Sequence, residues 1–362
     1  MPTLSLTQPL IKRRIRGVPN SFWAQIYLLL AVLETVVVLI IQIVNIANTA
    51  ADDSVDAWSN TKTVSSGSIL VYDSLFIVGQ LFFVVIAWEA VAHKNTIQVI
   101  ATTCFNCLLF VYALIQYFNN VNIAPADSTA SNLLVLRLCL GAITGVCSIA
   151  FAALTWELFL DFGWKIFKKL GADLAVRTMF KRRQVLITLF KLDVFFFVGY
   201  AIQTATLVLK VTDAETWVQI GVVMPGSVLV LTLGFYALHW EHARCMLVVM
   251  FCLAVSPAYF IYRLVRMYTV GNHGTMDPYW DTREYLLFFI IVNIVLILGT
   301  LYSCWLCYRD FGKGLKTRTL DYQNGKVKAQ VDAESTDAAA FTPGHAATHL
   351  PKSENRDRWQ LE

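Results

Sequence analysis

The sequence predicts an all-α, polytopic transmembrane helix bundle with about eight spans and with both termini in the cytosol. Three observations predict this fold class. The 362 residues are 57% hydrophobic and only 15% charged, whereas a soluble chain normally carries about 25% charged residues. The apolar residues gather in long runs, and a bilayer core of ~30 Å needs about 20 of them in one helix. The Lys and Arg residues fall mainly in alternate connections between the runs, which orients the runs across the bilayer.

The apolar runs are the predicted spans, and they lie at residues 22–46, 68–92, 96–118, 131–157, 184–209, 217–238, 245–267 and 284–307. The first run is longer than the core of a cleavable signal peptide, which has about 7–15 residues. The runs lack the alternation of barrel strands, so we expect helices. We divide the chain into a basic N-terminal segment at 1–21, one bundle at 22–310 and a disordered polar tail at 311–362.

The basic residues orient this bundle. An N-terminus in the cytosol places Lys12, Arg13, Arg14 and Arg16, the connection after residue 157 and the Lys/Arg-rich tail all on the cytosolic side. The opposite connections carry few basic residues and include the acidic stretch Asp52–Asp56. Cytosolic connections are enriched in Lys and Arg, so we expect both ends of the chain in the cytosol.

The connection at 158–183 is the most informative stretch between spans. It reads as an amphipathic helix lying in the headgroup plane, with apolar residues toward the membrane and basic residues toward anionic lipid. The expected lipid-facing residues are Trp164, Lys165, Lys168, Lys169, Arg177, Lys181, Arg182 and Arg183. These residues serve either to fix the topology or to recognise a specific lipid or partner, and the sequence leaves both readings open.

Two motifs in this region carry a resemblance to a known family. The run Asp161–Asp173 reads DFGWKIFKKLGAD, and Lys191–Gly199 reads KLDVFFFVG. Together they resemble an uncharacterised fungal family of multi-pass Golgi apparatus membrane proteins. The chain departs from the family pattern at Lys181–Gln184 and at Val194, where aromatic residues are expected. The resemblance implies a Golgi apparatus membrane location, with another endomembrane or the plasma membrane as alternatives, and it implies no reaction.

Ionisable residues inside spans are costly, by roughly 2.5–3.5 kcal/mol each on insertion scales, and so each needs a reason. The candidates for an intramembrane polar site are Glu34, Asp73, Arg137, Lys191 and Asp193. By depth, Asp73 is expected to pair with Arg137, and Glu34 with Lys191. Lys191 and Asp193 are two residues apart on a helix and point in different directions, so they cannot pair well directly. The five residues either hold the bundle together or form a proton-coupled polar pathway.

The remaining motifs say less about function. Gly141 and Gly145 form a G-x-x-x-G pattern that favours close helix packing, either within the bundle or between two copies. Cys304 and Cys307 are candidates for reversible palmitoylation. His239–His242 lacks the full spacing of a zinc hydrolase, and Trp240 within it is an expected interfacial anchor.

No nucleotide-binding, nucleophile-elbow or metalloprotease motif is found, which removes positive support for an enzyme. We therefore expect no cofactor, no metal and no nucleic acid, and the lipid bilayer with its anionic cytosolic lipids as partner. The leading hypothesis is a trafficking or interaction factor. The alternative is a small-solute or proton-coupled transporter.

Overall fold

The computed structural model describes residues 22–56, 66–123, 128–170, 174–208, 217, 219–270 and 282–312. These residues form long α-helices and two short π-helical turns, at Thr204–Val208 and Gln219–Val223. The α-helices are α1 (Phe22–Asp56), α2 (Ser66–Ala92), α3 (Thr96–Ile123), α4 (Ser128–Leu170), α5 (Leu174–Gln203), α7 (Met224–Trp240), α8 (Ala243–Val270) and α9 (Arg283–Asp310).

Eight helices in the described part of the chain are long and apolar enough to cross a membrane, which confirms the predicted all-α bundle of about eight spans. The cytosolic location of the two termini stays a prediction. Their outward surface is strongly apolar. Leu29, Ile149 and Phe251 are 61%, 74% and 72% exposed, although each is a large apolar side chain. Asp73 and Asp193, by contrast, are fully buried. Polar residues inside and apolar residues outside are the arrangement that hydrocarbon, rather than water, stabilises.

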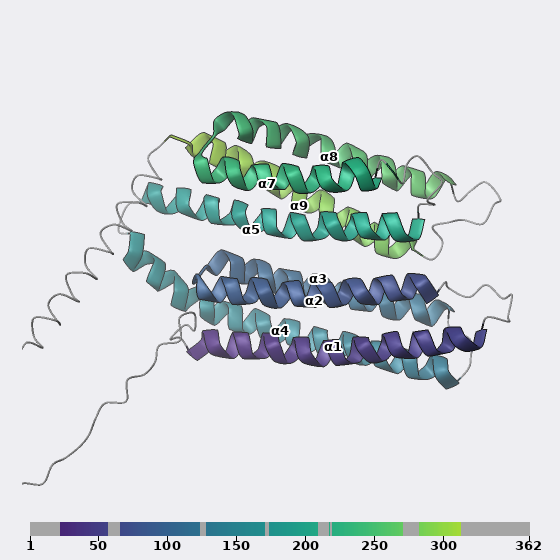
Figure 1. Cartoon of the computed structure of the whole chain (residues 1–362). Helices are drawn as coiled ribbons and strands as arrows, with labels where there is room; N and C mark the ends of the chain where they lie inside the picture. The colour runs from purple at the N-terminus through teal and green to yellow at the C-terminus, as the bar shows by residue number, and fades with distance from the viewer. Residues whose placement is uncertain are drawn as a thin grey trace, which may run out of the picture. The chain divides into compact units, whose positions relative to one another are not determined.

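The eight helices form two four-helix rings (Figure 1). In the first ring, α1 and α3 each pack against both α2 and α4. In the second ring, α5 and α8 each pack against both α7 and α9. In each ring the first helix packs against the last, α1 against α4 and α5 against α9. The two halves of the chain therefore repeat the same order of neighbouring helices.

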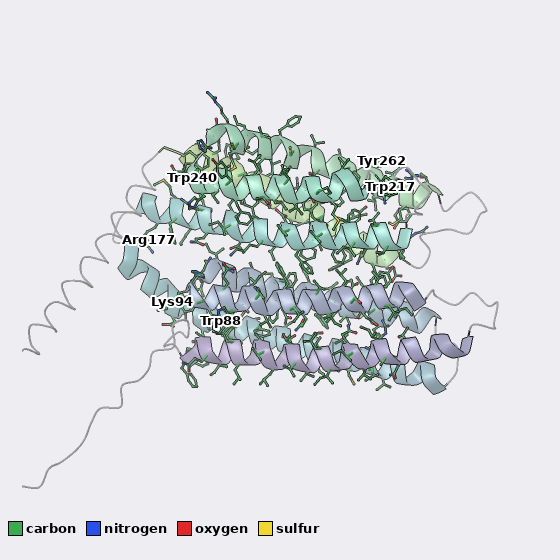
Figure 2. The ribbon with its side chains drawn as sticks, in the orientation of Figure 1. Trp88, Lys94, Arg177, Trp217, Trp240 and Tyr262 are labelled. Atoms are coloured by element: carbon green, nitrogen blue, oxygen red, sulfur yellow. The ribbon has the colours of Figure 1, made fainter. Side chains whose placement is uncertain are left out.

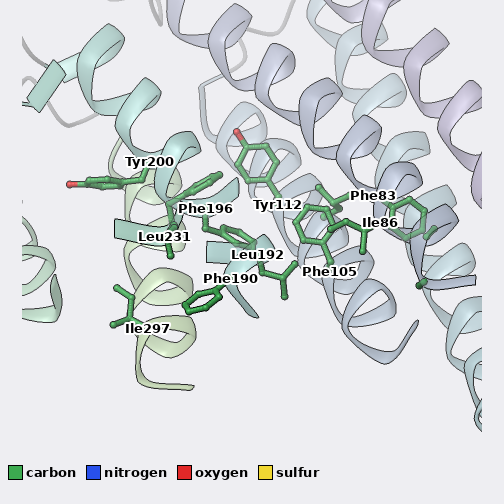
Figure 3. Packing of buried hydrophobic residues seen from close by; sticks show 14 of the residues in the cluster. Phe83, Ile86, Phe105, Tyr112, Phe190, Leu192, Phe196, Tyr200, Leu231 and Ile297 are labelled. Atoms are coloured by element: carbon green, nitrogen blue, oxygen red, sulfur yellow. The ribbon is translucent and has the colours of Figure 1, made fainter. Parts of the chain in front are cut away.

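The rings meet where α2 and α3 pack against α5 and α9. Phe105 and Tyr112 of α3 face Leu192 and Phe196 of α5 across this joint (Figure 3). The rings of Phe105 and Phe196 lie 5.8 Å apart, and those of Tyr72 and Tyr285 stack at 3.7 Å. Aromatic contacts of this kind stabilise packing beyond the burial of area alone, by about 0.5–1.5 kcal/mol each.

One end of the bundle is basic and aromatic. Trp88, Lys94, Arg177 and Trp240 lie there, whereas Trp217 and Tyr262 lie at the other end (Figure 2). Trp88, Trp240, Trp217 and Tyr262 are each 49–65% exposed, and exposed Trp and Tyr residues are enriched at both surfaces of a bilayer. We call the end with Lys94, Arg177 and Trp240 the basic end. That it faces the cytosol stays a prediction.

Two tight turns close the basic end. Lys94 and Glu241 adopt left-handed backbone conformations, with φ of 53° and 55°. The Lys94 turn joins α2 to α3, and the Asn95 amide donates a hydrogen bond to the Ala90 carbonyl at 2.9 Å. Glu241 ends α7, and α8 begins two residues later at Ala243. Such short connections require antiparallel neighbours, as alternating spans demand.

The expected loop at 158–183 is largely helical. The helix α4 continues without a break to Leu170, and α5 begins at Leu174. The stretch therefore consists of the ends of two long helices, and its place in the headgroup plane stays a prediction. The side chains of Trp164, Lys165, Lys168 and Lys169 lie outside the described residues, as do the expected terminal segments at 1–21 and 313–362.

Candidate functional site

Asp73 of α2 and Arg137 of α4 form an ion pair inside the first ring. The Nη2 of Arg137 lies 3.5 Å from the Oδ2 of Asp73, and the two side chains are 3% and 0% exposed. Gln116 of α3 donates a hydrogen bond from its Nε2 to the Oδ1 of Asp73 at 3.2 Å. Gln42 of α1 donates to Gln116 at 3.5 Å. This polar cluster joins all four helices of the ring, and its carboxylate is bound on both oxygens.

Lys191 of α5 pairs with Glu89 of α2, and the predicted pairing with Glu34 is wrong. The Nζ of Lys191 lies 2.5 Å from the Oε1 of Glu89. Gln98 donates to the other oxygen of Glu89 at 3.1 Å. The reason is the arrangement of the helices, because α5 packs against α2 and α3, whereas Glu34 lies on α1 in the first ring.

Sequence reasoning missed Glu89, although a signal for it existed. Glu89 lies close to the end of the predicted span 68–92, and Lys191 lies a similar depth into the predicted span 184–209. Matching depths from the same side of the bilayer would have made Glu89 a candidate partner. The pair spans the joint between the two rings. Of the five candidates, Lys191 is therefore the residue whose ion pair links the two halves of the chain.

Asp193 points away from Lys191, toward α9. Its Oδ2 accepts a hydrogen bond from the Thr300 hydroxyl at 2.6 Å, and its Oδ1 has no partner within the described residues. Asn293 of α9 also reaches α5 and donates to the Phe196 carbonyl at 3.2 Å. Polar contacts of Asp193 and Asn293 thus hold α5 against α9 inside the second ring.

Glu34 of α1 differs from the other four candidates. It is 2% exposed, and neither carboxylate oxygen has a hydrogen-bond partner in the described part of the chain. The side chains of Gln80 and Asn106 are its polar neighbours. These amides are bound elsewhere, to the hydroxyls of Thr35 at 3.5 Å and Ser148 at 3.3 Å. An isolated ionised carboxylate is unfavourable in an apolar interior.

The five candidates therefore do not form one site. Glu34, Asp73 and Arg137 lie in the first ring, Asp193 lies in the second, and Lys191 lies at the joint. A small cavity of about 20 Å³ also lies at the joint. It is lined by apolar and aromatic residues from both rings, including Leu109, Tyr112, Phe196 and Phe289. A space of this size could hold about one water, but the lining offers few polar partners for it.

Two further sequence hypotheses change with the structure. Cys304 and Cys307 are 0% and 4% exposed, so their thiols are not presented for palmitoylation, and that hypothesis is withdrawn. Gly145 lies against Phe110 of α3, where an added Cβ would come within 2.8 Å of the ring. Of the two roles considered for the G-x-x-x-G pattern, packing within the bundle is the one that this contact favours.

The basic end contains the described part of the predicted basic loop. Arg182 of α5 binds Asp310 of α9, with 2.8 Å between Nη1 and Oδ2. Arg183 lies 4.0 Å from Glu241, and Lys181 is exposed. Among the described residues, no group of three His, Cys, Asp or Glu side chains could hold a metal ion.

A groove of about 460 Å³ opens at this end between α5 and α7. Sequence reasoning missed it, because it depends on which helices are neighbours. The lining residues are Arg183, Ile187, Thr232, Phe235, Tyr236, Leu238, His239 and Trp240. Cationic, aromatic and aliphatic side chains thus share one concave surface.

Comparison with known proteins finds a relative of this chain. The chain is 27% identical over 285 residues to a UPF0658 Golgi apparatus membrane protein of Schizosaccharomyces pombe, covering 70% of this chain and 79% of that protein. The chain is a relative of a fungal Golgi apparatus membrane protein. No family model and no solved structure matches it.

This relationship confirms the resemblance that the Asp161–Asp173 and Lys191–Gly199 motifs indicated. It also confirms the predicted location, the Golgi apparatus membrane, and the multi-pass character of the chain. The name of the UPF0658 relative states a cellular location and no molecular activity. A molecular activity must therefore be argued from the residues.

Proposed function

We propose that this Golgi membrane protein is an interaction or trafficking factor that docks partners or anionic lipid through its basic end. The docking surface consists of Trp164, Lys165, Lys168, Lys169, Arg177, Lys181, Arg182 and Arg183, together with the polar tail at 311–362. In this proposal the basic end faces the cytosol, where anionic lipid attracts each basic residue by about 1 kcal/mol.

One observation carries the proposal. Four of the five intramembrane candidates bind a side chain of another helix, through the pairs Asp73–Arg137, Lys191–Glu89 and Asp193–Thr300. Charges bound in this way join neighbouring helices, and removing one partner of the buried Asp73–Arg137 pair would leave a buried charge without its counter-charge. Lys181 at the basic end is exposed, and in this proposal it acts with the lysines of 165–169 on an external partner.

The test uses cells that produce only a variant of the full-length chain. Replacing Lys165, Lys168, Lys169 and Lys181 with Gln removes four charges and spares Arg182 and Arg183, which have internal partners. The matched control replaces the same four residues with Arg. We expect both variants to reach the Golgi, and only the Gln variant to slow the exit of secreted glycoproteins from it. A Gln variant that supports normal exit, while deletion of the protein slows it, would refute the proposal.

A proton-coupled transporter is the second candidate, and Glu34 is the observation in its favour. Its carboxylate is buried without a hydrogen-bond partner among the described residues, as a group that takes up and releases a proton would be. Purified protein in liposomes with an internal pH dye tests this function. Proton flux that Glu34→Gln abolishes, and that the four Lys→Gln changes preserve, would support transport over docking.

A further inference from the structure

The groove between α5 and α7 has the shape and chemistry of a lipid site. Its α5 wall carries Arg183 and Ile187, and its α7 wall runs from Thr232 to Trp240. The two helices pack closely beside it, where a Cβ on Gly234 would lie 2.7 Å from the Phe190 ring. With a volume of about 460 Å³, the groove falls within the ordinary range for small-ligand sites.

Polar and apolar groups are separated along the groove. Arg183 and His239 supply cationic or hydrogen-bonding groups, while Ile187, Phe235 and Leu238 supply aliphatic and aromatic walls. Tyr236 and Trp240 are 48% and 53% exposed. Aromatic side chains of this kind sit at the headgroup level of a bilayer. The groove therefore presents a cation beside an apolar surface at the depth where a phospholipid changes from headgroup to acyl chain.

Arg183 has capacity for a further partner. Its contact with Glu241 spans 4.0 Å, whereas neighbouring Arg182 binds Asp310 at 2.8 Å. A guanidinium carries five N–H donors arranged to bind a phosphate through two hydrogen bonds at once. A long contact to one carboxylate leaves most of these donors available. The Glu241 carboxylate would repel an anion bound at Arg183, so its side chain would have to turn away as the anion binds.

The surroundings of the groove decide which anion it fits. Leu229 of α7 and Val222 of the preceding π-helical turn are 66% and 65% exposed, so this part of the chain faces hydrocarbon along its outer side. Free phosphate would contact Arg183 and leave the apolar walls bare. A phospholipid can fill both parts, because its acyl chains continue into the surrounding bilayer.

We propose that this groove binds one acidic glycerophospholipid, with the phosphate at Arg183 and the upper acyl chains against Ile187, Phe235 and Leu238. The inference goes beyond the proposed docking function and rests on it only in placing the basic end at a leaflet that contains acidic lipid. Arg183 belongs to both surfaces, but Lys181 lies outside the groove lining, so the four Lys→Gln changes test the docking function without altering the groove.

Photo-crosslinking of the full-length protein in phosphatidylcholine nanodiscs tests this inference. The probe is phosphatidylserine with a diazirine near the top of one acyl chain, and the labelled peptides are identified by mass spectrometry. We expect labelling within residues 183–187 and 232–240, and competition by unlabelled phosphatidylserine but not by phosphatidylcholine. Competition by inorganic phosphate to the same extent would overturn the choice of a lipid as occupant.

Two pairs of variants make the test specific. Arg183→Gln removes a charge inside the groove, and we expect about a tenfold loss of labelling, the usual consequence of losing a charge-assisted hydrogen bond. Lys181→Gln removes the same charge outside the groove and should leave labelling unchanged. Thr232→Trp fills the groove without changing charge and should also abolish labelling, whereas Leu229→Trp on the outer face should not.

Equal labelling of the wild type, Arg183→Gln and Thr232→Trp would overturn the inference, as would labelling spread evenly over the outer surface of the helices. If Arg183→Gln does not fold, Thr232→Trp still decides the outcome. Loss of labelling in the groove variants together with normal glycoprotein exit in the four Lys→Gln variant would refute the docking function and keep the lipid site.

Discussion

Lys191 of α5 and Glu89 of α2 lie 2.5 Å apart at the joint between the two helix rings. Their side chains are 22% and 36% exposed, so the pair lies near the basic end rather than in the deep interior. Gln98 binds the second oxygen of Glu89, and nearby Asn95 donates to Gln184 of α5 at 2.8 Å. Contacts between α2 or α3 and α5 therefore fix one end of the joint, and the Tyr72–Tyr285 stack contributes elsewhere along it.

Replacing Lys191 with Met should weaken this joint. We expect Lys191→Met and Glu89→Gln each to lower the thermal midpoint of the protein in detergent, and the double variant to lose less than the sum of the two. The coupling free energy should be about 1 kcal/mol, in the range of polar contacts between membrane helices. Strictly additive losses would show that the pair does not contribute.

Replacing Asp73 with Asn should be more damaging. The substitution keeps an acceptor for Gln116 but leaves the buried Arg137 without its counter-charge. Breaking one side of a buried pair destabilises by about 3–5 kcal/mol, so we expect loss of folded protein on size-exclusion chromatography. Combining Asp73→Asn with Arg137→Met should restore much of the yield. Failure of this double variant to recover would contradict the role of the pair.

The two glycines of the G-x-x-x-G pattern should differ in tolerance. A Cβ at Gly145 would lie 2.8 Å from Phe110, whereas a Cβ at Gly141 would meet Leu114 at 3.9 Å. We therefore expect Gly145→Ala to lower the thermal midpoint, at a cost of about 1–3 kcal/mol for overpacking, and Gly141→Ala to change it little. Equal effects at both positions would argue against the packing described here.

Glu34 should tolerate removal of its charge. Glu34→Gln keeps the shape of the side chain and removes an ionisable group that has no partner among the described residues. We expect unchanged or higher thermal stability, because an unpaired buried carboxylate is unfavourable. A large loss of stability would instead show that Glu34 has a structural partner when ionised.

The fold was largely predictable because the bilayer imposes it. Apolar runs of span length must be helical when no water is present to bind the backbone, so the eight helices follow from composition and run length. The pairing of Asp73 with Arg137 followed from their equal depth on different predicted spans.

The sequence did not predict which helices are neighbours. The wrong partner for Lys191 and the missed groove both result from this. Depth alone made Glu34 a partner for Lys191, but the structure places α5 beside α2 and α3 and leaves Glu34 inside the first ring. The same missing information hid the α5–α7 groove, whereas Glu89 was missed although its depth matches that of Lys191. At 158–183, the composition predicted a helix but did not show that α4 continues into this stretch without a break as far as Leu170.

The most direct test of the account is protease protection of epitope tags at both termini, in sealed Golgi vesicles whose outer surface is cytosolic. Eight membrane-crossing helices, with the basic end toward the cytosol, predict that added protease removes both tags without detergent, while an inserted tag in the connection at 271–281 is removed only after detergent is added. Protection of either terminal tag in intact vesicles, or cleavage of the 271–281 tag there, would contradict the account.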